Sequence, residues 1–148
     1  MKILGTCSVI VACVVLFGCA SPGEPGGGMQ RTHADCTGAS CQVAVKVDCT
    51  ATPCVATAIP KELDVLTPNG TKVIHWKLDA PDGYAFADEK VQFASGAPFN
   101  CTPPGAGQME VTCVDTHAGP GEYGYTLAVV KVADPTSRIP VDPWIVNR

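Results

Sequence analysis

Strict alternation of apolar and polar residues is the feature that most constrains the fold of this chain. In the segment "CQVAVKVDC", residues 41–49, Val43, Val45 and Val47 share one face with the flanking cysteines, and the intervening residues share the other face. A period of two places successive side chains on opposite faces of an extended strand. The segment therefore predicts a half-buried β-strand.

The same alternation recurs along the chain, and turn-forming sequences such as "APDG" and "HAGPGE" separate the repeats. No long stretch carries the apolar stripe of a helix. Roughly seven or eight short strands with frequent turns predict an all-β fold, a small antiparallel β-sandwich of immunoglobulin-like architecture. The further strand segments are "CVATAI", "ELDVL", "KVIHWKLD", "GYAFA", "KVQFA", "QMEVTCV" and "EYGYTLAVVKV".

Turn residues predict how some of these strands pair. A short loop containing Pro53 lets Cys49 and Cys54 face each other across a hairpin. Asn69-Gly70 readily adopts a tight turn, so we expect residues 62–66 and 72–79 to form another hairpin. The prolines of "TSRIPV" and the following "DPWIVN", residues 142–147, disfavour a central strand, so this last segment is expected to dock as a tail on an edge of the sandwich.

The N-terminus has the layout of an export signal, with Met1-Lys2 followed by the apolar run "ILGTCSVIVACVVLFG" and small residues. The last residues of this run, Leu16-Phe17-Gly18-Cys19, resemble the lipobox of bacterial lipoproteins. The resemblance implies that Cys19 is lipidated with acyl chains such as palmitate, and that it becomes the first residue of the mature protein. Two or more acyl chains anchor a protein stably without a transmembrane helix.

Two other interpretations of the N-terminus remain open. Residues 3–20 are long enough for an uncleaved membrane-spanning helix, and Gly18-Cys19-Ala20 also fits an ordinary secretory cut that would discard the cysteine. In Gram-negative lipoproteins an Asp directly after the lipidated cysteine marks retention in the inner membrane. Ala20 stands there instead, so the resemblance implies a lipid-anchored outer-membrane protein that faces the periplasm.

The sequence divides into three parts. Residues 1–18 are the expected signal peptide, and residues 19–35 contain the Gly- and Pro-rich stretch "SPGEPGGGMQRTHAD", which predicts a flexible tether. Residues 36–148 are the expected β-sandwich domain, a comfortable size for one core. The C-terminal half, including "VIHWKLDAPDGYAFADEKVQF" and "DPWIVN", is also similar to small exported bacterial β-domains, and this likeness implies no activity.

Six cysteines fall within the expected domain, and an even set in an exported protein is typical of a disulfide framework. Nearest-neighbour pairing is the simplest hypothesis, although the sequence alone leaves the connectivity open. A zinc site built from the two CxxxxC pairs is the alternative, and it would suit a cytosolic protein better. The expected pairs are Cys36–Cys41, Cys49–Cys54 and Cys101–Cys113.

Composition and motifs narrow the function classes. The formal net charge of −4 and the lack of a Lys/Arg cluster argue against a nucleic-acid partner. The histidines His33, His75 and His117 have no metal-binding spacing, and Ser95 lacks the GxSxG motif of a serine nucleophile. We therefore predict no catalytic residue, no metal and no cofactor.

Two function classes remain. The favoured one is a non-enzymatic binding or interaction module of the cell envelope, which recognises a protein or envelope component. Its candidate binding residues are Asp82 in "DAPDG" and Asp115 and His117 in "DTHAGPGEYG", because loops on a rigid scaffold commonly carry recognition. The alternative is a small envelope hydrolase with a site that no motif reveals.

Overall fold

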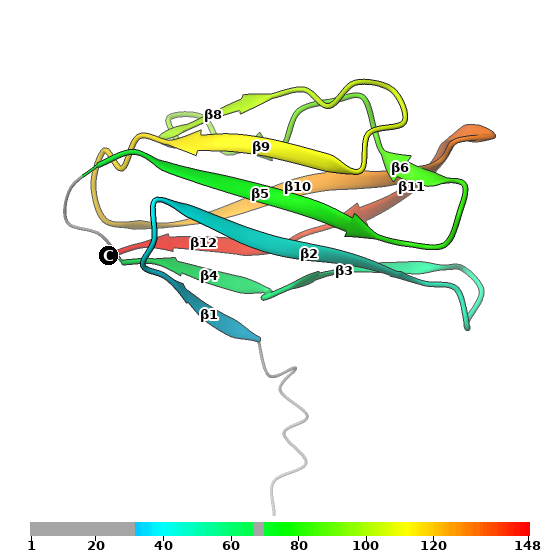
Figure 1. Ribbon diagram of the computed structural model, residues 1–148, viewed down its shortest axis with the longest axis horizontal. Helices are drawn as coiled ribbons and strands as arrows, with labels where there is room; N and C mark the ends of the chain where they lie inside the picture. The colour runs from blue at the N-terminus through cyan, green and yellow to red at the C-terminus, as the bar shows by residue number, and fades with distance from the viewer. Residues whose placement is uncertain (1–31, 67–69) are drawn as a thin grey trace, which may run out of the picture.

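The computed structural model describes residues 32–66 and 70–148, which form two β-sheets stacked face to face (Figure 1). The signal segment, the lipobox with Cys19 and nearly all of the expected tether lie outside the described residues. Within the described ranges no helix is long and apolar enough to cross a membrane.

The first sheet has seven strands, in the order β1-β4-β12-β10-β11, with β6 and β7 also paired to β10. Its ladders are antiparallel except β1–β4 and β4–β12, which are parallel. The strands are β1 (His33–Cys36), β4 (Glu62–Val65), β6 (Tyr84–Phe86), β7 (Gln92–Phe93), β10 (Gly121–Lys131), β11 (Asp134–Val141) and β12 (Trp144–Asn147).

The second sheet has five strands in the order β3-β2-β5-β9-β8. Its one parallel ladder joins β2 and β5. The strands are β2 (Ser40–Asp48), β3 (Val55–Ile59), β5 (Lys72–Asp79), β8 (Phe99–Thr102) and β9 (Glu110–Asp115). The all-β sandwich predicted from the alternating pattern is therefore confirmed, and its sheets are mixed because three ladders run parallel.

The core lies between the sheets and is centred on Trp76 of β5, which has no exposed surface. Its indole Nε1 donates a hydrogen bond of 2.7 Å to the Tyr125 hydroxyl on β10, and the two rings meet edge to face at 5.2 Å. Burial raises the pKa of the Tyr125 hydroxyl well above its usual range, an effect that the Trp76 hydrogen bond opposes. The pair therefore joins the sheets through the middle of the core.

Three disulfides staple the sandwich, as the even cysteine count predicts, and they link Cys36–Cys41, Cys49–Cys54 and Cys101–Cys113. The first joins β1 to β2 and so crosses from one sheet to the other. The second closes the β2–β3 hairpin, as its loop predicts, and the third joins directly opposed residues of β8 and β9. Each therefore fixes a different pair of strands.

Two of the predicted pairings are wrong. β4 and β5 do not form a hairpin, because Leu63 and Val65 pack inward in the first sheet while Ile74 and Trp76 pack inward in the second. "DPWIVN" is not an edge tail, because β12 lies between β4 and β10 as an interior strand. Pro143 directly precedes this strand, where the missing N–H removes no hydrogen bond from β12.

The folded region also begins earlier than the expected boundary at residue 36. β1 starts at His33 and pairs with β4 in parallel, His33 opposite Glu62 and Asp35 opposite Asp64. Residues 33–35, placed in the tether by their polarity, are thus part of the first sheet. The signal for this strand is the two-residue alternation of "HADC", in which Cys36 faces the core.

Candidate binding groove

The residues predicted for partner binding do not form one site. Asp82 is exposed in the turn after β5, whereas Asp115 ends β9 opposite Lys72, the first residue of β5. The length of β5, about 23 Å for its eight residues, separates the two ends. His117 follows Asp115 and lies at the same end of the sandwich.

Asp115 is fully buried, so the expectation that it presents its carboxylate to a partner from an exposed loop is wrong. Its Oδ1 accepts hydrogen bonds from the backbone N–H of His117 at 2.8 Å and from Asn147 Nδ2 at 3.3 Å. The first bond holds His117 in a left-handed conformation with φ of 49°, and the second ties the loop to β12. Asp115 therefore positions this loop.

Further buried polar groups lie at the same end. Lys72 faces Asp115 across the β5–β9 ladder and donates hydrogen bonds to the carbonyl oxygens of Thr37 and Gly38. Asp115 Oδ2, Asn147 Oδ1 and His117 Nδ1 have no hydrogen-bond partner among the described residues. Unsatisfied buried polar atoms lower the stability of the folded state. The few hydrogen bonds that Asp115 and Lys72 do make are therefore important for the stability of this end of the core.

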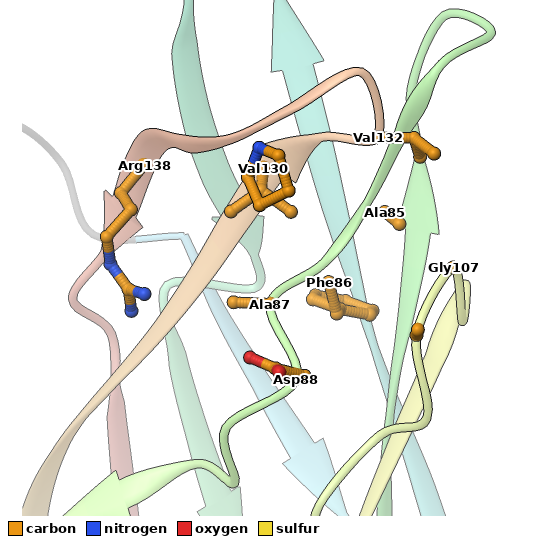
Figure 2. Close-up of a pocket in the computed structure, with 10 residues that line it drawn as sticks. Ala85, Phe86, Ala87, Asp88, Gly107, Val130, Val132 and Arg138 are labelled. Carbon is orange, nitrogen blue, oxygen red and sulfur yellow. The ribbon is translucent and has the colours of Figure 1, made fainter.

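Three hollows among the described residues lie along β11, one of the two edge strands of the first sheet. The first, of about 170 Å³, lies where Ala87, Val130 and Val132 form an apolar floor and Arg138 of β11 lines the pocket with Asp88 (Figure 2). The second, of about 500 Å³, lies between Ser137–Pro140 and the Cys49–Cys54 loop. The third, of about 290 Å³, lies between β3 and residues 140–143.

Neighbouring hollows share residues, because Arg138 lines the first and second and Pro140 lines the second and third. We call this succession the β11 groove. It occupies the side of the sandwich where the edge strands β3 and β11 lie next to each other. The sequence does not predict the β11 groove, because its walls come from strands of both sheets that are brought together only by tertiary packing.

Charge and exposure distinguish the β11 groove from the rest of the surface. Its second and third hollows are lined by three basic side chains, Lys61, Lys131 and Arg138, and one acidic side chain, Asp142, although the chain carries a net charge of −4. Arg138 also forms an ion pair with Glu89. Two exposed apolar side chains line the groove, Val55 on β3 and Val132 after β10.

Two histidines outside the β11 groove, His75 and His33, lie beside carboxylates. His75 Nδ1 lies 2.7 Å from Glu110 Oε1 and 3.3 Å from Thr112 Oγ1. A relay from hydroxyl to carboxylate needs both ring nitrogens, one for each partner, so this arrangement is a histidine–carboxylate contact on the outer face of a sheet and not a relay. His33 differs, because it lies near Asp35 and Asp64 with one potential ligand atom from each residue within 4.8 Å.

No protein-family model and no curated protein matches this chain. The assignment of function therefore depends on the geometry of the described residues.

The buried position of Asp115 generates a stability prediction. Asp115→Ala should lower the free energy of unfolding by about 3 kcal/mol, because it removes two hydrogen bonds to a charged acceptor and leaves the Asn147 amide unpaired. Urea denaturation followed by tryptophan fluorescence measures the change. Asp82→Ala is the matched control and should stay within about 0.5 kcal/mol of the wild type, as is usual for surface substitutions. An Asp115→Ala variant as stable as the wild type would refute the positioning role.

Proposed function

We propose that this protein is a non-enzymatic binding module of the bacterial cell envelope, anchored to the outer membrane through Cys19, which holds an extended segment of a protein partner in the β11 groove. The observation that carries the proposal is the β11 groove, whose second and third hollows lie between β11 and the β2–β3 hairpin and whose first hollow shares Arg138 with the second. The lipid anchor rests on the sequence resemblance of residues 16–19 to a lipobox.

Strand β3 supports binding of an extended segment. Among residues 32–66 and 70–148 it pairs only with β2, so alternate N–H and C=O groups face away from the sheet, as on any edge strand. Val55, Thr57 and Ile59 are exposed on it. A peptide that adds to such an edge gains main-chain hydrogen bonds and places alternate side chains into neighbouring pockets. β11 is less suited to pairing, because Pro135 and Pro140 lack N–H groups.

The basic lining of the second and third hollows indicates the chemistry of the partner. Lys131 and Arg138 line the second hollow and Lys61 lines the third. Complementary charge raises association rates and disfavours partners of the wrong sign. We therefore propose a partner segment that combines apolar side chains with Asp or Glu.

Site-specific photo-crosslinking in intact cells tests this proposal. A photoreactive amino acid at Thr57 or Ser137 should give a discrete protein adduct, because both positions border the β11 groove. The same group at Asp82, an exposed turn position outside the groove residues, should give none. Lys131→Glu should reduce the adduct about tenfold, a free-energy change of about 1.4 kcal/mol, because it places a like charge opposite the partner carboxylates.

Lys77→Glu is the matched control for the charge reversal, because Lys77 is an exposed lysine on the other sheet, outside the three hollows. It should leave the adduct unchanged. Adducts that form equally from Asp82, or that survive Lys131→Glu at full yield, would contradict a groove that selects acidic segments.

The anchor is tested separately by metabolic labelling. Radioactive palmitate should enter the wild-type protein and not Cys19→Ser, because the thiol of Cys19 is the attachment point that the lipobox implies. Mature protein that begins at Ser21, or equal labelling of both variants, would instead indicate an ordinary secretory cut or another acylation site.

A further inference from the structure

We propose that His33, Asp35 and Asp64 form a binding site for a divalent transition-metal ion on the outer face of the first sheet. The geometry points to a site distinct from the β11 groove, because none of the three residues lines its hollows. The ion class follows from the donor set, one imidazole nitrogen with two carboxylates, which suits Zn²⁺ better than the all-oxygen sites of Mg²⁺ and Ca²⁺.

The strand register brings these side chains together. In the parallel β1–β4 ladder Asp35 lies opposite Asp64, while the alternate residues Cys36 and Val65 point into the core. Asp35 and Asp64 therefore both lie on the outer face of the first sheet. Carboxylates directly opposite each other on neighbouring strands repel, so this placement favours any cation that can contact both.

The distances fit a metal with short bonds. His33 Nε2 lies 3.1 Å from Asp35 Oδ1 and 3.7 Å from Asp64 Oδ2. A tetrahedral ion with bonds of about 2.1 Å holds its ligand atoms about 3.4 Å apart, which falls between the two measured separations. These two separations differ from 3.4 Å by about 0.3 Å each, and the His33 and Asp35 side chains can adjust because they are about half exposed.

The hydrogen bonding of Asp64 is an independent observation in favour of a bound ion. The residue is only 4 % exposed, yet its Oδ1 has no hydrogen-bond partner among the described residues. Its Oδ2 accepts a hydrogen bond of 2.6 Å from Arg148 Nε, and this bond raises the pKa of the Arg148 guanidinium. Oδ2 is therefore the oxygen that both Arg148 and His33 approach, and Oδ1 of the same buried carboxylate keeps lone pairs without a partner among the described residues, so the carboxylate has capacity left to bind a metal ion.

The other ring nitrogen of His33 also has a suitable neighbour. Nδ1 lies 3.7 Å from Glu62 Oε1, on the residue opposite His33 in the β1–β4 ladder. Metal-bound histidines usually direct their second nitrogen toward a carboxylate or carbonyl, which fixes the ring orientation. Glu62 is placed for this positioning role, so three ligands and one supporting carboxylate come from two adjacent strands.

Isothermal titration of the full-length protein with Zn²⁺ alone tests the site. The protein is purified in detergent with its disulfides intact, and free thiols are alkylated so that cysteine cannot bind the ion. One equivalent should bind to the wild type. His33→Ala and Asp35→Asn should each weaken binding about tenfold or more, and both positions are exposed enough for the variants to fold.

His75→Ala is the matched control, because His75 is also a strand histidine beside a carboxylate, Glu110, but has no second acidic partner in its ion pairs. It should bind Zn²⁺ as the wild type does, and a rise in the melting temperature with Zn²⁺ should be lost only in the His33 and Asp35 variants. Absence of saturable binding, equal weakening by His75→Ala, or equal affinity for Ca²⁺ would overturn the proposal.

Discussion

The hydrogen bond between Trp76 and Tyr125 is the contact on which the arrangement of the two sheets depends. It is fully buried and joins the middle strand of the second sheet to the longest strand of the first. A buried indole N–H has to find a partner or pay for its lost hydration, so the bond selects one relative placement of β5 and β10. The Cys36–Cys41 disulfide adds a covalent link between the sheets near their N-terminal strands.

This cross-sheet connection leaves one side of the sandwich open. β3 and β11 are the edge strands that meet there, and they contact each other without forming a ladder. β11 contains Pro135 and Pro140, which cannot donate ladder hydrogen bonds, and hollows lie between the two edges. The Cys49–Cys54 disulfide closes the loop that forms one wall of the β11 groove, and a wall fixed in this way would lower the ordering cost of the proposed binding.

The sequence predicts the strands well and their partners less well. The predicted β2–β3 hairpin is confirmed. It could be predicted because the alternation in residues 41–49 and the Cys49–Cys54 spacing reflect contacts between residues close in sequence. Asn69-Gly70 is a strong local turn signal, yet the two strands around it belong to different sheets, because the inward faces of β4 and β5 both need the core. The alternation of apolar and polar residues does not specify which distant strands pair with each other.

The candidate sites show the same limit. Asp115 looks like an exposed loop residue in "DTHAGPG", but the β5–β9 register places it beside Lys72 inside the core. The cluster of His33, Asp35 and Asp64 requires a parallel pairing between segments about 30 residues apart, which no local pattern encodes. In each case the decisive contact is between strands that are distant in sequence.

Amide hydrogen exchange on the isolated protein tests whether a rigid core carries an open β3 edge that could accept a peptide. We predict slow exchange for Val43, Trp76 and Val129 in the interior strands, and fast exchange for alternate amides of β3, whose N–H groups have no partner strand in the part of the chain that the structure describes. Addition of the cross-linked partner segment should then slow those β3 amides. Uniformly slow exchange along β3 in the isolated protein would mean that this edge is already occupied, and would contradict the account.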